Sequence, residues 1–204
     1  MTTTNKTRAL STQYMTRIAV LTALSSILFL ISIPVIAFYH LDFSNLQVLL
    51  GAFSMGPVPG MIILFLKSLI GCLSSTTMYV GELGDFLMGA AFVLPAAIIY
   101  RKHKNRKGAL IGMLIGILAQ IVAGCLVNYL LLIPFYMTAF GMPMEAIIGM
   151  CAKTLPFVNS ELKVILFVTA PFNLLKGVVL CVLTYVIYKP VSPAACAQVT
   201  CGRI

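Results

Sequence analysis

Tryptophan is absent from the sequence, and acidic and histidine side chains are scarce: the 204 residues include five acids and two histidines. So few acids leave no aspartate cluster of the kind that metal-dependent lipid phosphotransferases use. The sequence also lacks a phosphate-binding glycine loop, a nucleophile elbow and a cluster of metal ligands. Its six cysteines show no Cys-x-x-Cys spacing. We therefore expect no enzyme, no metal, no cofactor and no ATP site within this chain.

Apolar residues, in contrast, make up 60% of the chain, against 9% charged residues. The mean hydropathy is +1.04. A soluble domain of this length cannot bury so much apolar surface, whereas a lipid bilayer accommodates it. Several runs approach or exceed the roughly 20 apolar residues that a spanning helix needs. The predicted fold class is an all-α integral membrane protein.

Basic residues give the chain a net charge of +9, and five of the fourteen lie in one short loop, Arg101–Lys107. A basic cluster between two apolar runs is typical of a loop that stays in the cytoplasm. We therefore interpret the excess as a signal of membrane topology, and we expect no nucleic-acid partner.

Six membrane helices are predicted within a single membrane domain, residues 16–189. The run Ile18–Phe38 is longer than the roughly 7–15-residue core of a secretory signal, so we interpret it as a retained first span. Residues 1–15 and 190–204 are interpreted as cytoplasmic segments. The predicted helices cover residues 16–38, 44–55, 57–74, 82–100, 108–137 and 162–188.

The number of spans depends on Gly56–Gly60, which has the sequence Gly-Pro-Val-Pro-Gly. If residues 44–74 formed one kinked helix, five spans would place the basic N-terminus and the Arg101–Lys107 loop on opposite sides. A hairpin at Gly56–Gly60 instead places both termini and this loop on one side, which then holds ten of the fourteen basic residues. We therefore predict six spans, with the N- and C-termini cytoplasmic.

The hairpin leaves a second helix of about a dozen residues, which rises only about 18 Å and cannot cross a core of about 30 Å alone. The preceding residues, 39–44, are therefore predicted to form a structured loop that dips in from outside. Short segments interrupted by proline or glycine often mark binding regions in transporters.

Asn173 and Lys176 form a polar pair inside the last apolar run. A lysine near the bilayer centre costs about 2.5–3.5 kcal/mol on insertion scales, so it should face protein or a solute. Their three-residue spacing places both on one face of a helix. One interpretation is a lysine that pairs with a carboxylate to hold helices together; the other is a face that binds a solute.

Further candidates lie in neighbouring spans. Asn128 carries a second amide, and an amide matches an edge that alternates carbonyl and N–H groups. Glu82 and Asp85 open the fourth span, where carboxylates favour a helix N-terminus; alternatively, Glu82 faces a cavity and meets Lys176 or a ligand hydroxyl. Six aromatic residues could stack on a flat ring or serve as plain packing: Phe43, Tyr79, Tyr129, Phe135, Tyr136 and Phe172.

Small residues follow the first span. Ala19 and Ala23 stand four residues apart, and Thr22 and Ser26 are predicted to continue the smooth surface. Small residues at this spacing let another helix approach closely, although internal packing produces the same pattern.

Four segments together resemble the riboflavin-specific S component of energy-coupling-factor (ECF) vitamin transporters, over roughly residues 14–190. The last of them is quite specific to the riboflavin group. The segments are Leu41–Ser44, Gly51–Gly60, Gly81–Gly89 and Thr169–Gly177.

The resemblance implies a six-helix subunit of the bacterial plasma membrane that binds riboflavin and docks on a transmembrane coupling (T) subunit driven by two ATPases. Riboflavin would be the transported ligand, and the alternative is another vitamin or a flavin such as FMN. By match to the family, Ala19 and Ala23 contact the coupling subunit. The matched pocket positions are Asn128, Asn173 and Lys176, with Leu41 and Asp42 in a gating loop and Glu82 and Tyr136 as further members.

Overall fold

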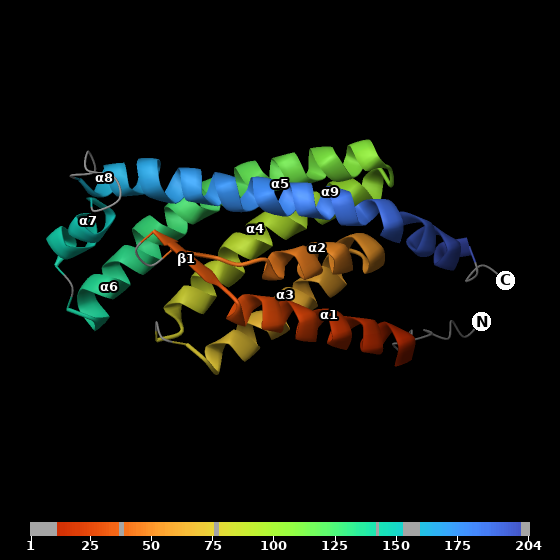
Figure 1. Ribbon diagram of the computed structural model, residues 1–204, viewed down its shortest axis with the longest axis horizontal. Helices are drawn as coiled ribbons and strands as arrows, with labels where there is room; N and C mark the ends of the chain where they lie inside the picture. Colours follow the sequence, from red (N-terminus) through yellow and green to blue (C-terminus); the bar gives the residue numbers. More distant parts are fainter. Residues whose placement is uncertain (1–11, 37–38, 76–77, 142, 153–159, 201–204) are drawn as a thin grey trace, which may run out of the picture.

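The computed structural model describes residues 12–36, 39–75, 78–141, 143–152 and 160–200. They form an elongated, nearly all-helical bundle (Figure 1). The start of α1, the α2–α3 turn and the α4–α5 turn lie at one end of the bundle, and α6, α7 and α8 lie at the other. The predicted helical class is confirmed for the described residues.

The helices follow the predicted order but differ in several bounds. Two elements, η1 and η2, are wider π-helical turns. The elements are α1 (Thr12–Leu30), β1 (Ile33–Ile36), β2 (Tyr39–Leu41), α2 (Ser44–Met55), α3 (Pro57–Cys72), α4 (Val80–Lys102), α5 (Arg106–Val127), η1 (Asn128–Leu132), α6 (Ile133–Ala139), α7 (Met144–Ala152), α8 (Glu161–Val164), η2 (Ile165–Thr169) and α9 (Ala170–Thr200).

The first span does not continue to residue 38, so that prediction is wrong. Helix α1 ends at Leu30, and β1 then pairs antiparallel with β2, with Ile33 opposite Leu41. Pro34 has no N–H to donate and disfavours a helical conformation at Ile33. The β-branched residues around it favour an extended chain. The predicted outer loop is therefore a short β-hairpin that leads into α2.

The break at Gly56 is confirmed. Gly56 has a φ of +108°, a conformation open to glycine, and it separates α2 from α3. The two helices then pack closely, since a Cβ on Gly60 would lie 2.5 Å from the Cβ of Ala52. Residues 44–72 are thus two packed helices and not one kinked helix.

Glycines also let α5 pack directly on the backbone of α4. A Cβ on Gly112 would lie 2.8 Å from the Ala96 carbonyl oxygen, and one on Gly116 would lie 2.6 Å from that of Phe92. This is the close approach that small residues at four-residue spacing permit. Helices α4 and α5 are the most closely packed pair of helices among the described residues.

The later part of the chain contains features that the sequence did not predict. Helix α7 was not expected, and the last two spans each contain a π-helical segment. Helix α9 continues to Thr200, beyond the predicted end at 188 and into the expected tail. Residues 1–11 and 201–204, which belong to the predicted terminal segments, lie outside the described residues.

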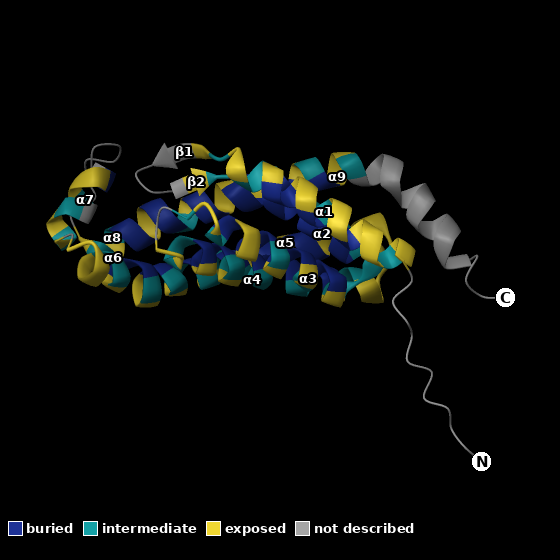
Figure 2. Cartoon of the chain, turned by 90° about the horizontal axis from the view of Figure 1, so that it is seen from below, coloured by how far each residue is buried: buried dark blue, intermediate teal, exposed yellow. Residues whose placement is uncertain are grey.

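Four helical stretches in the described part of the chain are long and apolar enough to cross a membrane: Thr12–Leu30, Val80–Lys102, Arg106–Ala139 and Glu161–Ile187. The shorter α3 is also apolar. Burial is concentrated in the middle of the bundle, and the outer faces are exposed (Figure 2). Exposed leucine, isoleucine and valine side chains on those faces fit a lipid environment.

Candidate functional site

Lys176 lies in the buried middle of the bundle and pairs with two carboxylates. Its Nζ is 2.7 Å from Asp42 Oδ2 and 3.1 Å from Asp85 Oδ1, and only 7% of its side chain is exposed. Asp42 follows β2 and Asp85 is on α4. The Lys176 ammonium therefore joins α9 both to the β1–β2 hairpin and to α4. The interpretation of Lys176 as a lysine that holds helices together therefore has a structural basis.

A second buried lysine, Lys67 on α3, completes the network. Its Nζ lies 2.7 Å from the other oxygen of Asp85 and 2.9 Å from Ser44 Oγ. It also donates to Asn45 Oδ1 at 3.1 Å and lies 5.1 Å from the centre of the Phe29 ring. Two lysines and two aspartates thus balance in charge, which a buried cluster requires.

The network fixes the segment that connects the hairpin to α2. The backbone N–H of Ser44 donates to Asp42 Oδ1 at 3.1 Å, and the Ser44 hydroxyl donates to the same oxygen. The Ser44 carbonyl in turn accepts from Ser25 Oγ on α1 at 2.8 Å. Asp42 is therefore held by its own chain on one side and by Lys176 on the other.

Asn173 lies one turn from Lys176 and faces α5 instead. Its Nδ2 donates to the Thr169 carbonyl at 2.9 Å, and its Oδ1 lies 3.5 Å from Gln120 Nε2. Gly124 makes room for it, because a Cβ there would lie 2.5 Å from Asn173 Nδ2. The Gln120 Oε1 atom is buried and has no hydrogen-bond partner among the described residues.

Asn128 lies on the same face of the fifth span, four residues after Gly124. It is 1% exposed, and its Nδ2 donates to the Gly124 carbonyl at 2.8 Å. Asn128 begins η1, and Thr169 ends η2; these two π-helical segments pack against each other. Single π-helical turns occur often at functional sites. The two amides and Gln120 form a buried polar seam, the α5–α9 seam, between the last two long spans.

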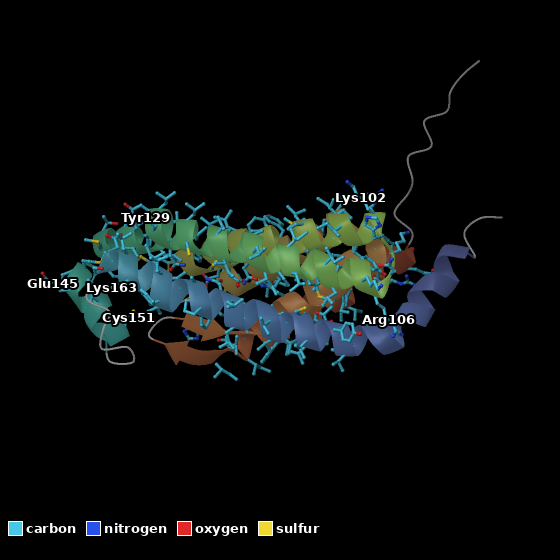
Figure 3. All side chains as sticks on the ribbon, turned by 90° about the horizontal axis from the view of Figure 1, so that it is seen from above. Lys102, Arg106, Tyr129, Glu145, Cys151 and Lys163 are labelled. Carbon is cyan, nitrogen blue, oxygen red and sulfur yellow. The ribbon has the colours of Figure 1, made fainter. Side chains whose placement is uncertain are left out.

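Leu41 belongs to a small apolar cluster, called the outer cluster because of its predicted orientation, at the end of the bundle that carries α6, α7 and α8. It packs with Ile148 against the buried side chains of Cys151, Val164, Val168 and Phe172. Figure 3 shows Glu145, Cys151 and Lys163 at this end, opposite the end that carries Lys102 and Arg106. Leu41 thus links the hairpin to α7, α8 and α9.

Glu82 and Tyr136 are on α4 and α6. Glu82 is buried near the start of α4, and its Oε2 accepts from Ser75 Oγ at 2.8 Å. Tyr136 is half-buried on α6, 5.6 Å between ring centres from Phe140. The carboxylate considered as a partner of Lys176 was Glu82, whereas Asp85, one helical turn later, makes that contact.

The aromatic residues considered for stacking on a flat ring lie only partly inside the protein. Tyr79 and Tyr129 are 63% and 48% exposed, so they do not line the interior. Phe172 is buried in the outer cluster.

The first helix exposes both of its predicted contact residues. Ala19 and Ala23 are exposed on α1, but Thr22 and Ser26 are buried and do not extend that surface as predicted. Of the residues in an 18-residue apolar stretch of α1, 17% are buried. The corresponding share for the Glu161–Ile187 span is 56%. This helix therefore leaves a broad face open to lipid or to another helix.

Sequence reasoning named Lys176, Asp42, Asn173 and Asn128 as site candidates. It did not name as site residues four others that also lie in the interior: Lys67, Asp85, Gln120 and Gly124. Asp85 could have been found because it and Lys67 are rare charges within apolar runs. Gln120 is a neutral polar side chain within the apolar fifth span, which is a weaker signal of the same kind. Among the described residues, no group of His, Cys, Asp and Glu side chains could hold a metal ion.

These features define a helical membrane protein whose interior carries a charge-balanced cluster and a row of amides. Residues 13–188 match the family described as ECF transporter, substrate-specific component. The chain belongs to this family, and it is accordingly a transport subunit and not an enzyme.

Relatives of known name agree over nearly the whole length. The chain is 30% identical to the riboflavin transporter RibU of Staphylococcus aureus (strain TCH60), covering 91% of this chain and 95% of that protein. It is 24% identical to the riboflavin transporter FmnP of Bacillus subtilis (strain 168), covering 86% and 90%. A solved structure described as "Structure and mechanism of the S component of a bacterial ECF transporter" superposes with a TM-score of 0.67 at 28% identity, covering 88% and 95%.

Proposed function

We propose that this S component binds riboflavin with high affinity and mediates its uptake across a bacterial plasma membrane. The observation that carries the proposal is the similarity to named riboflavin transporters over about nine-tenths of the chain. A transmembrane coupling (T) subunit and two ATPase subunits would supply the energy. The absence of an ATP-binding motif from this sequence fits that division of labour.

The α5–α9 seam supplies the groups that a flavin needs. The pyrimidine edge of the ring alternates carbonyl and N–H groups, and the Asn128 and Asn173 amides each offer one donor group and one acceptor. Both amides donate to backbone carbonyls of their own helix, four residues earlier. A backbone carbonyl has two lone pairs, so it keeps its helical hydrogen bond when the amide turns to a ligand.

The remaining site residues take supporting roles in this proposal. Leu41 and Asp42 close the outer side, Leu41 through the outer apolar cluster and Asp42 through Lys176. Glu82 and Tyr136 meet the ribityl hydroxyls near the start of α4. Lys176 then connects the closed hairpin to the helix that carries Asn173, so that binding and closure share one helix.

We further propose six membrane segments within residues 16–189, with both termini cytoplasmic and residues 1–15 and 190–204 as cytoplasmic segments. The shared location of the α2–α3 turn and the α4–α5 turn, next to the basic side chains of Lys102 and Arg106, supports this orientation (Figures 1 and 3). The exposed pair Ala19 and Ala23 would receive the coupling subunit on α1.

Riboflavin titration of the purified protein tests the function. We expect quenching of flavin fluorescence with saturation at one ligand per chain. Asn173→Ala should weaken binding by about 1–3 kcal/mol, or about five- to 160-fold in Kd, because a ligand group is left unpaired in a buried site. Leu118→Ala is the matched control, because Leu118 is 65% exposed on the surface of α5. This variant should bind riboflavin as the unmodified chain does.

Two results would count against this proposal in different ways. If protein that is folded by circular dichroism binds no flavin at all, the ligand assignment is wrong. If riboflavin binds but Asn173→Ala leaves the Kd unchanged, the proposed function stands, and the assignment of Asn173 as a riboflavin-binding residue is wrong. Competition with thiamine and pantothenate tests the alternative of another vitamin.

A further inference from the structure

A groove on the outer surface between α3 and α4 plays no part in the proposed riboflavin site. Its volume is about 540 Å³. Val58, Phe65 and Ile98 are 67%, 56% and 46% exposed along it. Its lining is wholly apolar: Pro57, Val58, Met61, Ile62, Phe65, Leu66, Phe86, Leu94 and Ile98.

The length of the groove matches one leaflet of a bilayer. Along α4 it extends from Phe86 to Ile98, thirteen residues that rise about 18 Å along the helix. The hydrocarbon core of a bilayer is about 30 Å thick, so this is about half of it. The groove begins near the end of α4 and the α2–α3 turn, which lie at the same end of the bundle (Figure 1). A single acyl chain has the chemistry and the length to occupy it.

Basic side chains stand at the mouth of the groove. Leu94, Ile98 and Lys102 follow one another at four-residue spacing on α4, and Arg101 is adjacent. Arg101 and Lys102 are both exposed. Tyr100, which precedes them, contacts the Phe53 ring at 4.5 Å and is the kind of residue that marks the membrane interface.

The charge at this end is of one sign. Between Asp85 and Glu145 the sequence holds five basic residues and no acidic one. Basic clusters beside membrane helices attract anionic lipid headgroups, and basic pockets between helices bind them. An apolar groove of leaflet length that ends at such a cluster is complementary to both parts of an anionic phospholipid.

We propose that the α3–α4 groove binds an anionic phospholipid, with one acyl chain along Ile62 and Ile98 and the headgroup phosphate at Arg101 and Lys102. The lipid would brace α3, which carries Lys67, against the outer surface of α4. This site is separate from the flavin site and does not depend on the identity of the transported ligand.

Native mass spectrometry of the full chain with dioleoyl phosphatidylglycerol or dioleoyl phosphatidylcholine tests the proposal. We expect retention of one phosphatidylglycerol in preference to phosphatidylcholine. Arg101→Gln with Lys102→Gln should reduce that retention about thirtyfold, and Ile62→Trp should abolish it by filling the groove. Lys104→Gln with Lys107→Gln removes the same charge from the same loop, and Leu118→Trp adds the same ring to the outer face of α5; both should retain the lipid.

Several results would overturn the proposal. Equal retention of the two lipids would show that the groove does not select an anionic headgroup. Equal loss of phosphatidylglycerol in the two charge variants would mean that the whole basic loop attracts the lipid without a specific headgroup site. Lipid retention by Ile62→Trp would mean that the lipid binds outside the groove. If Ile62→Trp spared lipid retention but prevented assembly with the coupling subunit, the groove would be a protein-docking surface. Circular dichroism of each variant serves as the folding control.

Discussion

Asp85 is the shared anion of the buried network, and its neutralisation should be the most damaging single change there. Asp85→Asn leaves Lys67 and Lys176 with one carboxylate, Asp42, and so leaves an uncompensated positive charge inside the bundle. Removing one partner of a buried ion pair costs about 3–5 kcal/mol. We expect a loss of that size in the free energy of unfolding.

A second substitution shows whether charge balance is the cause. Lys67→Met fills a similar volume without charge and restores neutrality when it is combined with Asp85→Asn. Because the Asp42–Lys176 pair stays intact, the double variant should be more stable than Asp85→Asn alone. A positive coupling of this kind is the expected signature of residues in direct contact.

The assay is thermal and denaturant unfolding in detergent, followed by circular dichroism at the helical band. Glu82→Gln is the matched control, since it removes an acid three residues earlier whose Oε2 accepts from a serine hydroxyl. We expect it to cost less than half as much as Asp85→Asn. Additive effects of the two network substitutions, or an Asp85→Asn variant as stable as the unmodified chain, would refute the reasoning.

Three further predictions concern binding and assembly. Gly124→Ala should fold, because its methyl group meets the end of the Asn173 side chain, but it should weaken riboflavin binding at least fivefold by displacing that amide; Gly149→Ala, which enters open space, is the control, and equal affinities would contradict the prediction. Riboflavin should outcompete FMN in a fluorescence competition assay, because the Lys176 ammonium is already paired with two carboxylates and would not meet a phosphate; equal affinities would show that the pairs open. Ala19→Trp should block uptake in cells and spare riboflavin binding to the purified chain, and loss of both would indicate a folding defect instead.

Composition was sufficient to predict the helical membrane class and the order of the long helices, and the distribution of basic residues favoured a break at Gly56–Gly60 over one kinked helix. The structure shows the local cause of that break, a glycine with positive φ between α2 and α3. The end of the first helix was missed because apolar content alone extended it, although Pro34 and its β-branched neighbours favour a strand. The sequence also did not reveal α7 or the π-helical turns, which depend on packing between distant segments.

The interior was harder to predict than the helices. Lys176 was found because a cation in an apolar run is costly and needs a partner. Asp85 was explained by its place near a helix N-terminus, a local rule that also holds for Glu82, so nothing local distinguished the two acids. Their roles differ because Asp85 lies one turn deeper, where Lys67 and Lys176 reach it from helices on either side.

We infer that the short hairpin of β1 and β2 moves as one unit when this end of the bundle opens. Two paired strands move together as a flap, whereas an unpaired loop can rearrange residue by residue. Such a flap needs only two hinges, at Ile31 before it and at Phe43 after it. Asp42 lies beside the second hinge, so its ion pair with Lys176 and the packing of the neighbouring Leu41 together hold the flap against the bundle.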